Sequence, residues 1–155
     1  MEDNNVLQQY LNTLLMVQRQ EQMRTSIQLT LGQLIEQLEK AGTINDETGK
    51  PKGVVFDFGN TYPTTLDSWR GSYAELALGY SELWPNDTKV NAVQLLEDCK
   101  QAIGRTYKGY KGGHFKMNKN TPIWVANYGH SSNTGIVGVM DCRYRLIILT
   151  AYMEY

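Results

Sequence analysis

The sequence contains few of the residues that build catalytic and metal centres. Its only cysteines and histidines are Cys99, Cys142, His114 and His130. Neither cysteine belongs to a CxxC or Cys/His spacing, which argues against a zinc site and a disulfide framework. The histidines lie sixteen residues apart in no paired motif, and the glycines of residues 109–113 lack the GxxxxGK[ST] order of a phosphate-binding loop. We therefore expect neither a metal, nor a cofactor, nor ATP hydrolysis.

Long hydrophobic runs are also missing. No apolar stretch approaches the ~20 residues that cross a bilayer. The first ten residues, MEDNNVLQQY, lack the basic start and apolar run of a secretory signal. We therefore expect a soluble, intracellular protein. A chain of 155 residues is long enough to bury roughly two thirds of its unfolded surface as one domain.

Acidic residues are absent from the segment Arg105–Lys119, which contains five Lys/Arg. Residues 1–98 contain seven Lys/Arg and fourteen Asp/Glu, whereas residues 99–155 contain eight Lys/Arg and two Asp/Glu. Aromatic residues and glycines are interleaved with the cations: Tyr107, Gly109, Tyr110, Gly112, Gly113 and Phe115. A nucleic-acid-binding domain is basic overall, so this segregation favours a small anionic ligand, or self-association of acidic and basic faces.

Two interpretations of the segment Arg105–Lys119 stay open. Cations can bind phosphate, aromatic faces can stack on a base, and glycines let backbone N–H groups approach a ligand. A hairpin with solvated lysines on one face and core aromatics on the other would have the same composition. The sequence alone does not choose between an anion site and such a hairpin.

The N-terminal region predicts a first helix that is capped by Asp3 or Asn4. Apolar residues recur along one stripe of this helix: Val6, Leu7, Tyr10, Leu11, Leu14 and Leu15. The stripe fits either the protein core or a helical interface with another protomer. A second helix begins after Thr30, which forms a capping box with Gln33, and ends at Gly42.

Downstream of the polar loop at residues 45–52, short apolar runs predict strands: Val54–Phe58, Thr106–Lys108, His114–Met117, Ile123–Asn127, Ile136–Met140 and Tyr144–Tyr152. A turn containing Pro63 and a Ser-Trp-Arg-Gly corner lead to a further strand, and a third helix is predicted over Thr88–Ile103. We expect an α+β protein: a helical arm over residues 1–43, used for oligomerisation, then a mostly antiparallel sheet with one packed helix over residues 53–155.

Enzymatic residues are few. His114 follows two glycines and could act as an acid or base, or form an ordinary hydrogen bond in a strand. Asp57 and Asp67 could pair for acid–base chemistry, although a carboxylate that caps a turn is the simpler interpretation.

A ligand-binding site has more candidates. Arg70 could bind a phosphate with its guanidinium or pair with Asp67. Asn127 could recognise the edge of a base or ribose, or cap the turn before Gly129. Three rings could stack on a base or belong to the core: Tyr73, Tyr110 and Phe115.

Two stretches resemble the first type of Thoeris anti-defence proteins of phages: FDFGNTYPTTLDSWRGSYAELALGY and AIGRTYKGYKGGHFKMNKNTPIWVANYGHSSNTGIVGV. The resemblance covers roughly residues 53–140. It implies a protein without enzymatic activity that binds the cyclic ADP-ribose isomers made by bacterial TIR-domain enzymes and withholds them uncleaved. It also implies hexamers built through N-terminal helices, and a separate site for cyclic trinucleotides of the CBASS type. Such a protein acts in the cytoplasm of the infected bacterium, without DNA, RNA or membrane partners.

Carried onto this chain, the resemblance and the side-chain chemistry together place the nucleotide site at Arg70, Tyr73, Tyr110, Lys111, Phe115 and Asn127. A trinucleotide site fits Arg24 and Gln28, because three copies of Arg24 around an axis could face three phosphates. Two other functions remain open. One is a small nucleotide-processing enzyme that uses His114, and the other is a protein-binding inhibitor that uses the N-terminal helix.

Overall fold

The computed structural model describes residues 2–23, 27–58, 61–68, 76–82, 90–108, 114–126 and 134–153. These residues form three helices and eight strands: α1 (Glu2–Met23), α2 (Leu31–Ala41), β1 (Gly53–Phe56), β2 (Thr61–Ser68), β3 (Leu76–Glu82), α3 (Ala92–Ala102), β4 (Thr106–Lys108), β5 (His114–Lys116), β6 (Ile123–Val125), β7 (Thr134–Asp141) and β8 (Arg145–Tyr152).

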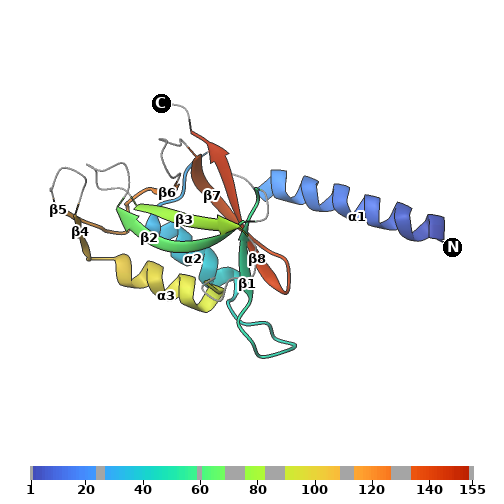
Figure 1. Cartoon of the computed structure of the whole chain (residues 1–155), viewed down its shortest axis with the longest axis horizontal. Helices are drawn as coiled ribbons and strands as arrows, with labels where there is room; N and C mark the ends of the chain where they lie inside the picture. Colours follow the sequence, from blue (N-terminus) through green and yellow to red (C-terminus); the bar gives the residue numbers. More distant parts are fainter. Residues whose placement is uncertain are drawn as a thin grey trace.

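Six strands form one mixed sheet in the order β1-β8-β7-β6-β3-β2 (Figure 1). The pairs β1–β8 and β3–β6 are parallel, and the other neighbours are antiparallel. Strands β4 and β5 form a separate antiparallel hairpin. The edge strands β1 and β2 also contact each other, so the sheet is strongly curled. The predicted α+β class with a mostly antiparallel sheet is confirmed.

The start of α2 is fixed by the capping box expected from the sequence. The Gln33 backbone N–H donates to Thr30 Oγ1 at 3.3 Å, and the Thr30 N–H donates to Gln33 Oε1 at 2.9 Å. The first two N–H groups of the helix, those of Leu31 and Gly32, donate to the carbonyls of Thr121 and Lys119 at 2.8 and 2.9 Å. The unpaired donors of the first turn are thereby satisfied, and α2 is tied to the turn before β6.

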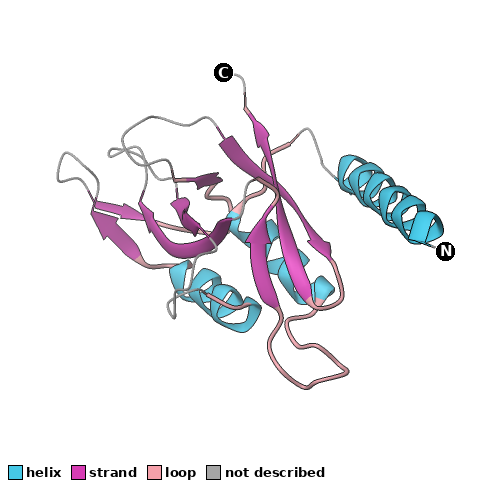
Figure 2. Cartoon of the chain, turned by 45° about the vertical axis from the view of Figure 1, so that its right-hand side comes forward, coloured by secondary structure: helices cyan, strands magenta, loops and turns pink. Residues whose placement is uncertain are grey.

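Helix α2 belongs to the core of the sheet-containing body. Leu31, Leu34, Ile35 and Leu38 are buried, and α2 packs against α3 and β7. Burying each such side chain contributes roughly 1.5–3 kcal/mol. The helical arm expected over residues 1–43 includes this helix. It lies in the core instead because its apolar stripe matches the sheet face, so two helices rather than one cover the sheet (Figure 2).

Helix α3 begins at Ala92, after Asn91, whose side chain accepts the Gln94 N–H at 2.9 Å. Its buried side chains are Ala92, Leu95, Cys99 and Ala102. The helix is followed by Gly104, whose φ of 80° suits a glycine. The Gly104 N–H donates to the Met117 carbonyl at 2.8 Å, so the end of α3 leads directly into the β4–β5 hairpin.

Both faces of the sheet are buried. The face toward α2 and α3 carries the main core, which includes Leu78, Ile123 and Ile148. The opposite face carries a second set of buried apolar side chains: Ala77, Trp124, Ala126, Val137, Met140, Ile147 and Leu149. Burial on both faces explains why β6 to β8 read as nearly continuous apolar runs rather than as alternating ones.

The sequence context of Pro63 predicted a turn, but Pro63 lies within β2. It pairs with Tyr80 of β3, and the register shifts between Pro63 and Leu66. Because β2 is an edge strand, one side of it has no neighbour that requires a backbone N–H, and a proline is tolerated beside the bulge.

A partly buried ion pair ties the end of α2 to β7. Lys52 is 6% exposed, and its Nζ donates to the Ala41 carbonyl at the end of α2 at 3.0 Å and to Asp141 Oδ1 at 3.1 Å. A cation is favoured at this end of a helix, where carbonyl groups lack intrahelical partners. The Lys52 ammonium group is therefore engaged in intramolecular contacts and is not available to bind a ligand.

Helix α1 projects away from the body, at the end opposite the β4–β5 hairpin (Figure 1). The chain between α1 and α2 is bound to the sheet, because the Leu29 N–H donates to the Ile136 carbonyl at 2.8 Å and the Ile123 N–H donates to the Leu29 carbonyl at 3.2 Å. Within the described part of the chain, no helix combines the length and the apolar character needed to span a bilayer.

Candidate functional site

The β4–β5 hairpin separates its aromatic residues from its cations. Tyr107 pairs with Phe115 on the inner face; Tyr107 is 6% exposed, and Phe115 is half-buried against the core. On the outer face, Lys108 pairs with His114 and Thr106 with Lys116, and all four residues are exposed. For the described residues, the hairpin therefore matches the alternative in which the lysines are solvated and the rings belong to the core.

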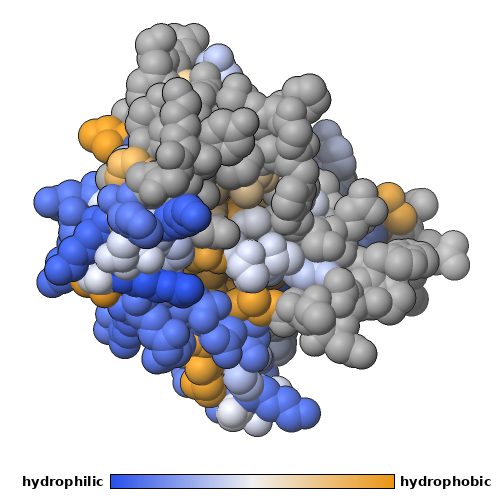
Figure 3. Space-filling model, turned by 60° about the vertical axis from the view of Figure 1, so that its left-hand side comes forward, coloured by the Kyte–Doolittle hydropathy of each residue, from blue (hydrophilic) through white to orange (hydrophobic). Residues whose placement is uncertain are grey.

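The exposed cations of this region are Arg105, Lys108, Lys116 and Lys119. None of them forms an ion pair with a residue that the structure describes. They differ in this respect from the buried Lys52, which is paired with Asp141. Seen from the hairpin side, the described surface is largely hydrophilic, with apolar patches between the polar residues (Figure 3).

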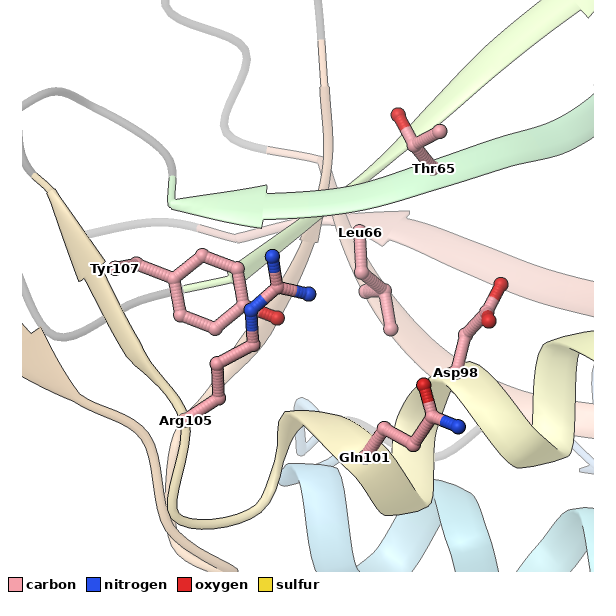
Figure 4. A pocket seen from close by; sticks show the side chains of 6 residues that line it. All are labelled: Thr65, Leu66, Asp98, Gln101, Arg105 and Tyr107. Atoms are coloured by element: carbon pink, nitrogen blue, oxygen red, sulfur yellow. The ribbon is translucent and has the colours of Figure 1, made fainter.

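A half-open hollow of about 160 Å³ lies between β2, α3 and the start of β4 (Figure 4). Its lining consists of Thr65, Leu66, Asp98, Gln101, Arg105 and Tyr107. The Arg105 guanidinium lies over the Tyr107 ring, 4.8 Å from the ring centre. This contact holds a positive charge at the hollow without neutralising it. The hollow is smaller than the roughly 300–1,000 Å³ of a pocket for a complete small ligand.

Two hydrogen bonds along α3 orient the acceptors in this hollow. Gln94 Nε2 donates to Asp98 Oδ1 at 2.8 Å, and Gln101 Nε2 donates to Glu97 Oε1 at 3.0 Å. Because the Gln101 nitrogen is engaged with Glu97, its carbonyl oxygen is turned toward the hollow (Figure 4). The α3 side of the hollow is thus an acceptor surface, and the Arg105 side is a donor surface.

Of the predicted ligand-binding residues, Gln28 and Phe115 are described, and both take part in the fold. Gln28 Nε2 donates to the Ile123 carbonyl at 2.7 Å, and the Gln28 side chain packs over Gly135. Phe115 packs against the core from the hairpin. The two residues were predicted for two different sites, and their side chains contact different elements. The other predicted residues lie outside the described part of the chain: Arg24, Arg70, Tyr73, Tyr110, Lys111 and Asn127.

Two candidate catalytic side chains, His114 and Asp57, are described, and they lie on different elements. His114 is exposed on the outer face of the hairpin, opposite Lys108. The Asp57 carboxylate accepts the Thr150 hydroxyl at 2.6 Å and the Thr150 backbone N–H at 2.9 Å, so it fixes the end of β1 to β8. No three metal-binding side chains cluster within the described ranges.

Of the residues that line the hollow, only Arg105 and Tyr107 stand out in the sequence, as parts of the basic segment. Asp98 and Gln101 look like ordinary polar residues on the solvent side of a helix, and Thr65 lies in a threonine-rich strand. The only signal was the i, i+3 spacing of Asp98 and Gln101, which places both on one helix face, and that spacing is too common to identify a site.

Similarity to known proteins does not indicate a function, so a functional assignment depends on the residues described above. Searches of protein-family models, curated proteins and solved structures gave no match to this chain.

Proposed function

We propose that this protein binds a phosphorylated cyclic nucleotide signal, of the cyclic ADP-ribose type, and sequesters it without cleaving it in the cytoplasm of a phage-infected bacterium. A separate site for a cyclic trinucleotide is part of the same proposal. The supporting observation is the set of exposed cations at the hairpin, Arg105, Lys108 and Lys116, none of which pairs with a described carboxylate. Cations that the fold does not neutralise remain free to bind phosphate.

The size of the hollow limits how the ligand could be held. Competition with a cellular receptor requires tight binding, and nanomolar affinity corresponds to about −12 kcal/mol. A half-open hollow of about 160 Å³ buries too little of a dinucleotide-sized ligand for this affinity. The proposal therefore needs further contacts, either from Arg70, Tyr73, Tyr110, Lys111 and Asn127 or from a second copy of the chain.

Helix α1 supports the expectation of an assembly. Its apolar side chains are 41–66% exposed: Val6, Leu7, Tyr10, Leu11, Leu14, Leu15, Met16 and Val17. An exposed apolar surface of this kind is typical of a protein interface. We propose that α1 packs against α1 of other copies and that the assembly is a hexamer. A protein-binding inhibitor that uses α1 on a host partner is the alternative, and the mass in solution distinguishes the two.

Calorimetric titration with cyclic ADP-ribose isomers, followed by heating and chromatography of the released ligand, tests the proposal. We expect binding and recovery of the ligand intact. Lys108→Ala with Lys116→Ala should weaken binding at least tenfold, since a hydrogen bond to a charged group contributes roughly 1.5–3 kcal/mol. Lys40→Ala with Lys50→Ala removes the same charge from exposed positions outside the hairpin and should leave the affinity within about twofold.

Two results would contradict the proposal. The first is the absence of binding by the unmodified protein. The second is recovery of a cleaved ligand, which would favour the nucleotide-processing enzyme. In that case His114→Ala should stop the cleavage, because imidazoles are the commonest proton-transfer groups in enzymes and His114 is the one histidine in the described part of the chain.

A further inference from the structure

We propose that the hollow between α3, β2 and β4 binds the vicinal diol of a ribose, with Asp98 and Gln101 as the hydrogen-bond acceptors. This inference rests on the proposed function, because it assigns one part of the nucleotide to one part of the site. Asp98 and Gln101 are not among the ligand-binding residues predicted from the sequence.

Charge decides which part of the ligand enters the hollow. The Asp98 carboxylate lies on the α3 side and forms no ion pair with any described residue. A phosphate beside it would be repelled, whereas a phosphate beside Arg105 or the lysines of the hairpin would be attracted. The α3 side of the hollow therefore takes a neutral group, and the phosphates lie toward Arg105 and the lysines of the hairpin.

The hydrogen-bonding groups select a donor. The Asp98 carboxylate and the Gln101 carbonyl oxygen, one helical turn apart on α3, both accept hydrogen bonds. Two adjacent hydroxyl groups of a ribose present two donors to this pair of acceptors, and a carboxylate that accepts from ribose hydroxyls is a recurring arrangement in nucleotide-binding proteins. On the opposite wall, the Leu66 side chain points toward α3, whereas the Thr65 side chain points away from it (Figure 4).

Size and shape favour a sugar over a base. The hollow measures about 160 Å³, below the range of pockets that hold a complete ligand, so it accepts a fragment. A base requires an exposed flat surface for stacking. Tyr107 is 6% exposed, and its ring is covered by the Arg105 guanidinium. Leu66 provides an apolar wall that suits the carbon face of a sugar.

Titration with a cyclic ADP-ribose isomer, and with its deoxy analogue lacking one hydroxyl of the free diol, tests the assignment. We expect the unmodified protein to bind the diol form roughly tenfold more tightly or better, as expected for a hydrogen bond to a charged group. Asp98→Asn should weaken binding of the diol form by a similar factor and leave binding of the deoxy form unchanged, so that the discrimination disappears.

Gln101→Leu provides a second variant, which should reduce the same discrimination without a change in charge. Asp46→Asn, at an exposed position in the loop after α2, matches the charge change of Asp98→Asn and should alter neither affinity. Binding by the unmodified protein with equal affinities for the two ligands, or equal losses for both ligands in Asp98→Asn, would overturn the diol assignment alone. No binding of either ligand by the unmodified protein would overturn the proposed function itself.

Discussion

Helices α1 and α2 each have apolar residues at helical spacing, but their surroundings are opposite. The apolar stripe of α2 is 0–8% exposed, whereas the corresponding side chains of α1 are 41–66% exposed. The start of α2 is bound to the turn before β6 by two backbone hydrogen bonds, and its stripe lies on the sheet. The comparison teaches that periodicity identifies the face that a helix can bury, but not whether its own chain supplies the partner.

The largest expected effect would come from placing charge on the exposed stripe of α1. Leu11→Asp with Leu14→Asp should abolish assembly, because carboxylates in an apolar helix interface are desolvated without a partner. Light scattering would show the mass of one chain, and circular dichroism would show the body still folded.

Asn12→Asp is the matched control for this variant. It adds charge on the polar side of α1, where Asn12 accepts a hydrogen bond from Gln8, and should keep the assembly intact. A double variant that still assembles would show that α1 is not the assembly surface. An unmodified protein with the mass of one chain would favour a host partner for α1.

Truncation in the covered helix should have the next largest effect. Leu34 is fully buried in α2, so Leu34→Ala should lower the free energy of unfolding by about 2–5 kcal/mol. Leu15→Ala in α1, made in the Leu11→Asp, Leu14→Asp background to remove any contribution from assembly, should change it by no more than about 0.5 kcal/mol. Urea unfolding measures both values, and equal losses would mean that α1 packs within its own chain.

Helix α3 buries one face in the core, as α2 does, and this face includes the ionisable thiol of Cys99. Its burial should therefore be detectable as a change of stability at alkaline pH. Burial, reinforced by the nearby Asp98 carboxylate, raises the pKa of the Cys99 thiol from an ordinary value of 9.0 to about 12. Between these values the unfolded chain loses the thiol proton and the folded chain keeps it. The free energy of unfolding should therefore fall by up to about 1.4 kcal/mol per pH unit as the pH rises above 9.

Urea unfolding at several pH values measures this slope. Cys99→Ala removes the thiol, so its slope above pH 9 should be shallower than that of the unmodified protein, although its stability at neutral pH is lower because of the cavity. As an independent check, an alkylating reagent should modify Cys142, which is half-buried, before Cys99. If the unmodified protein and Cys99→Ala showed the same slope, burial in α3 would not raise the pKa of the Cys99 thiol.

The smallest expected effect concerns the capping box that fixes the start of α2. Thr30→Ala removes the acceptor for the Gln33 N–H and should cost about 1 kcal/mol of stability. Thr30→Ser should retain most of it. On α1, Thr13 donates only to the Gln9 carbonyl, so Thr13→Ala should change stability by less than about 0.5 kcal/mol. Thermal unfolding distinguishes these outcomes, and an equal cost at both positions would contradict the role of the cap.

Local signals in the sequence predicted much of the fold. The capping box at Thr30, the end of α2 at Gly42 and the strands after Arg105 are close to where they were expected, because they depend on neighbouring residues. The parallel pairing of β1 with β8 was not predicted, since it joins residues more than ninety positions apart. Pro63 was assigned to a turn because the sequence does not show which strand is at an edge.

The site was less predictable than the fold. The segment Arg105–Lys119 was found because its cations are contiguous, and its composition fitted two arrangements equally well. Strand alternation in the hairpin decided between them for Tyr107 and Phe115. The hollow depends on α3, β2 and β4 meeting, so Asp98 and Thr65 could not be associated with Arg105 before the packing was known.

Gly135 of β7 lies close to the segment that precedes α2. A methyl group at this position would lie 2.9 Å from Met153 Cγ and 3.1 Å from the side chain of Gln28, which precedes α2 in the chain. Because both neighbours are flexible side chains, such a group would displace them and disturb the hydrogen bond from Gln28 Nε2 to the Ile123 carbonyl. The close fit of the segment before α2 on the sheet therefore depends on the absence of a side chain at residue 135.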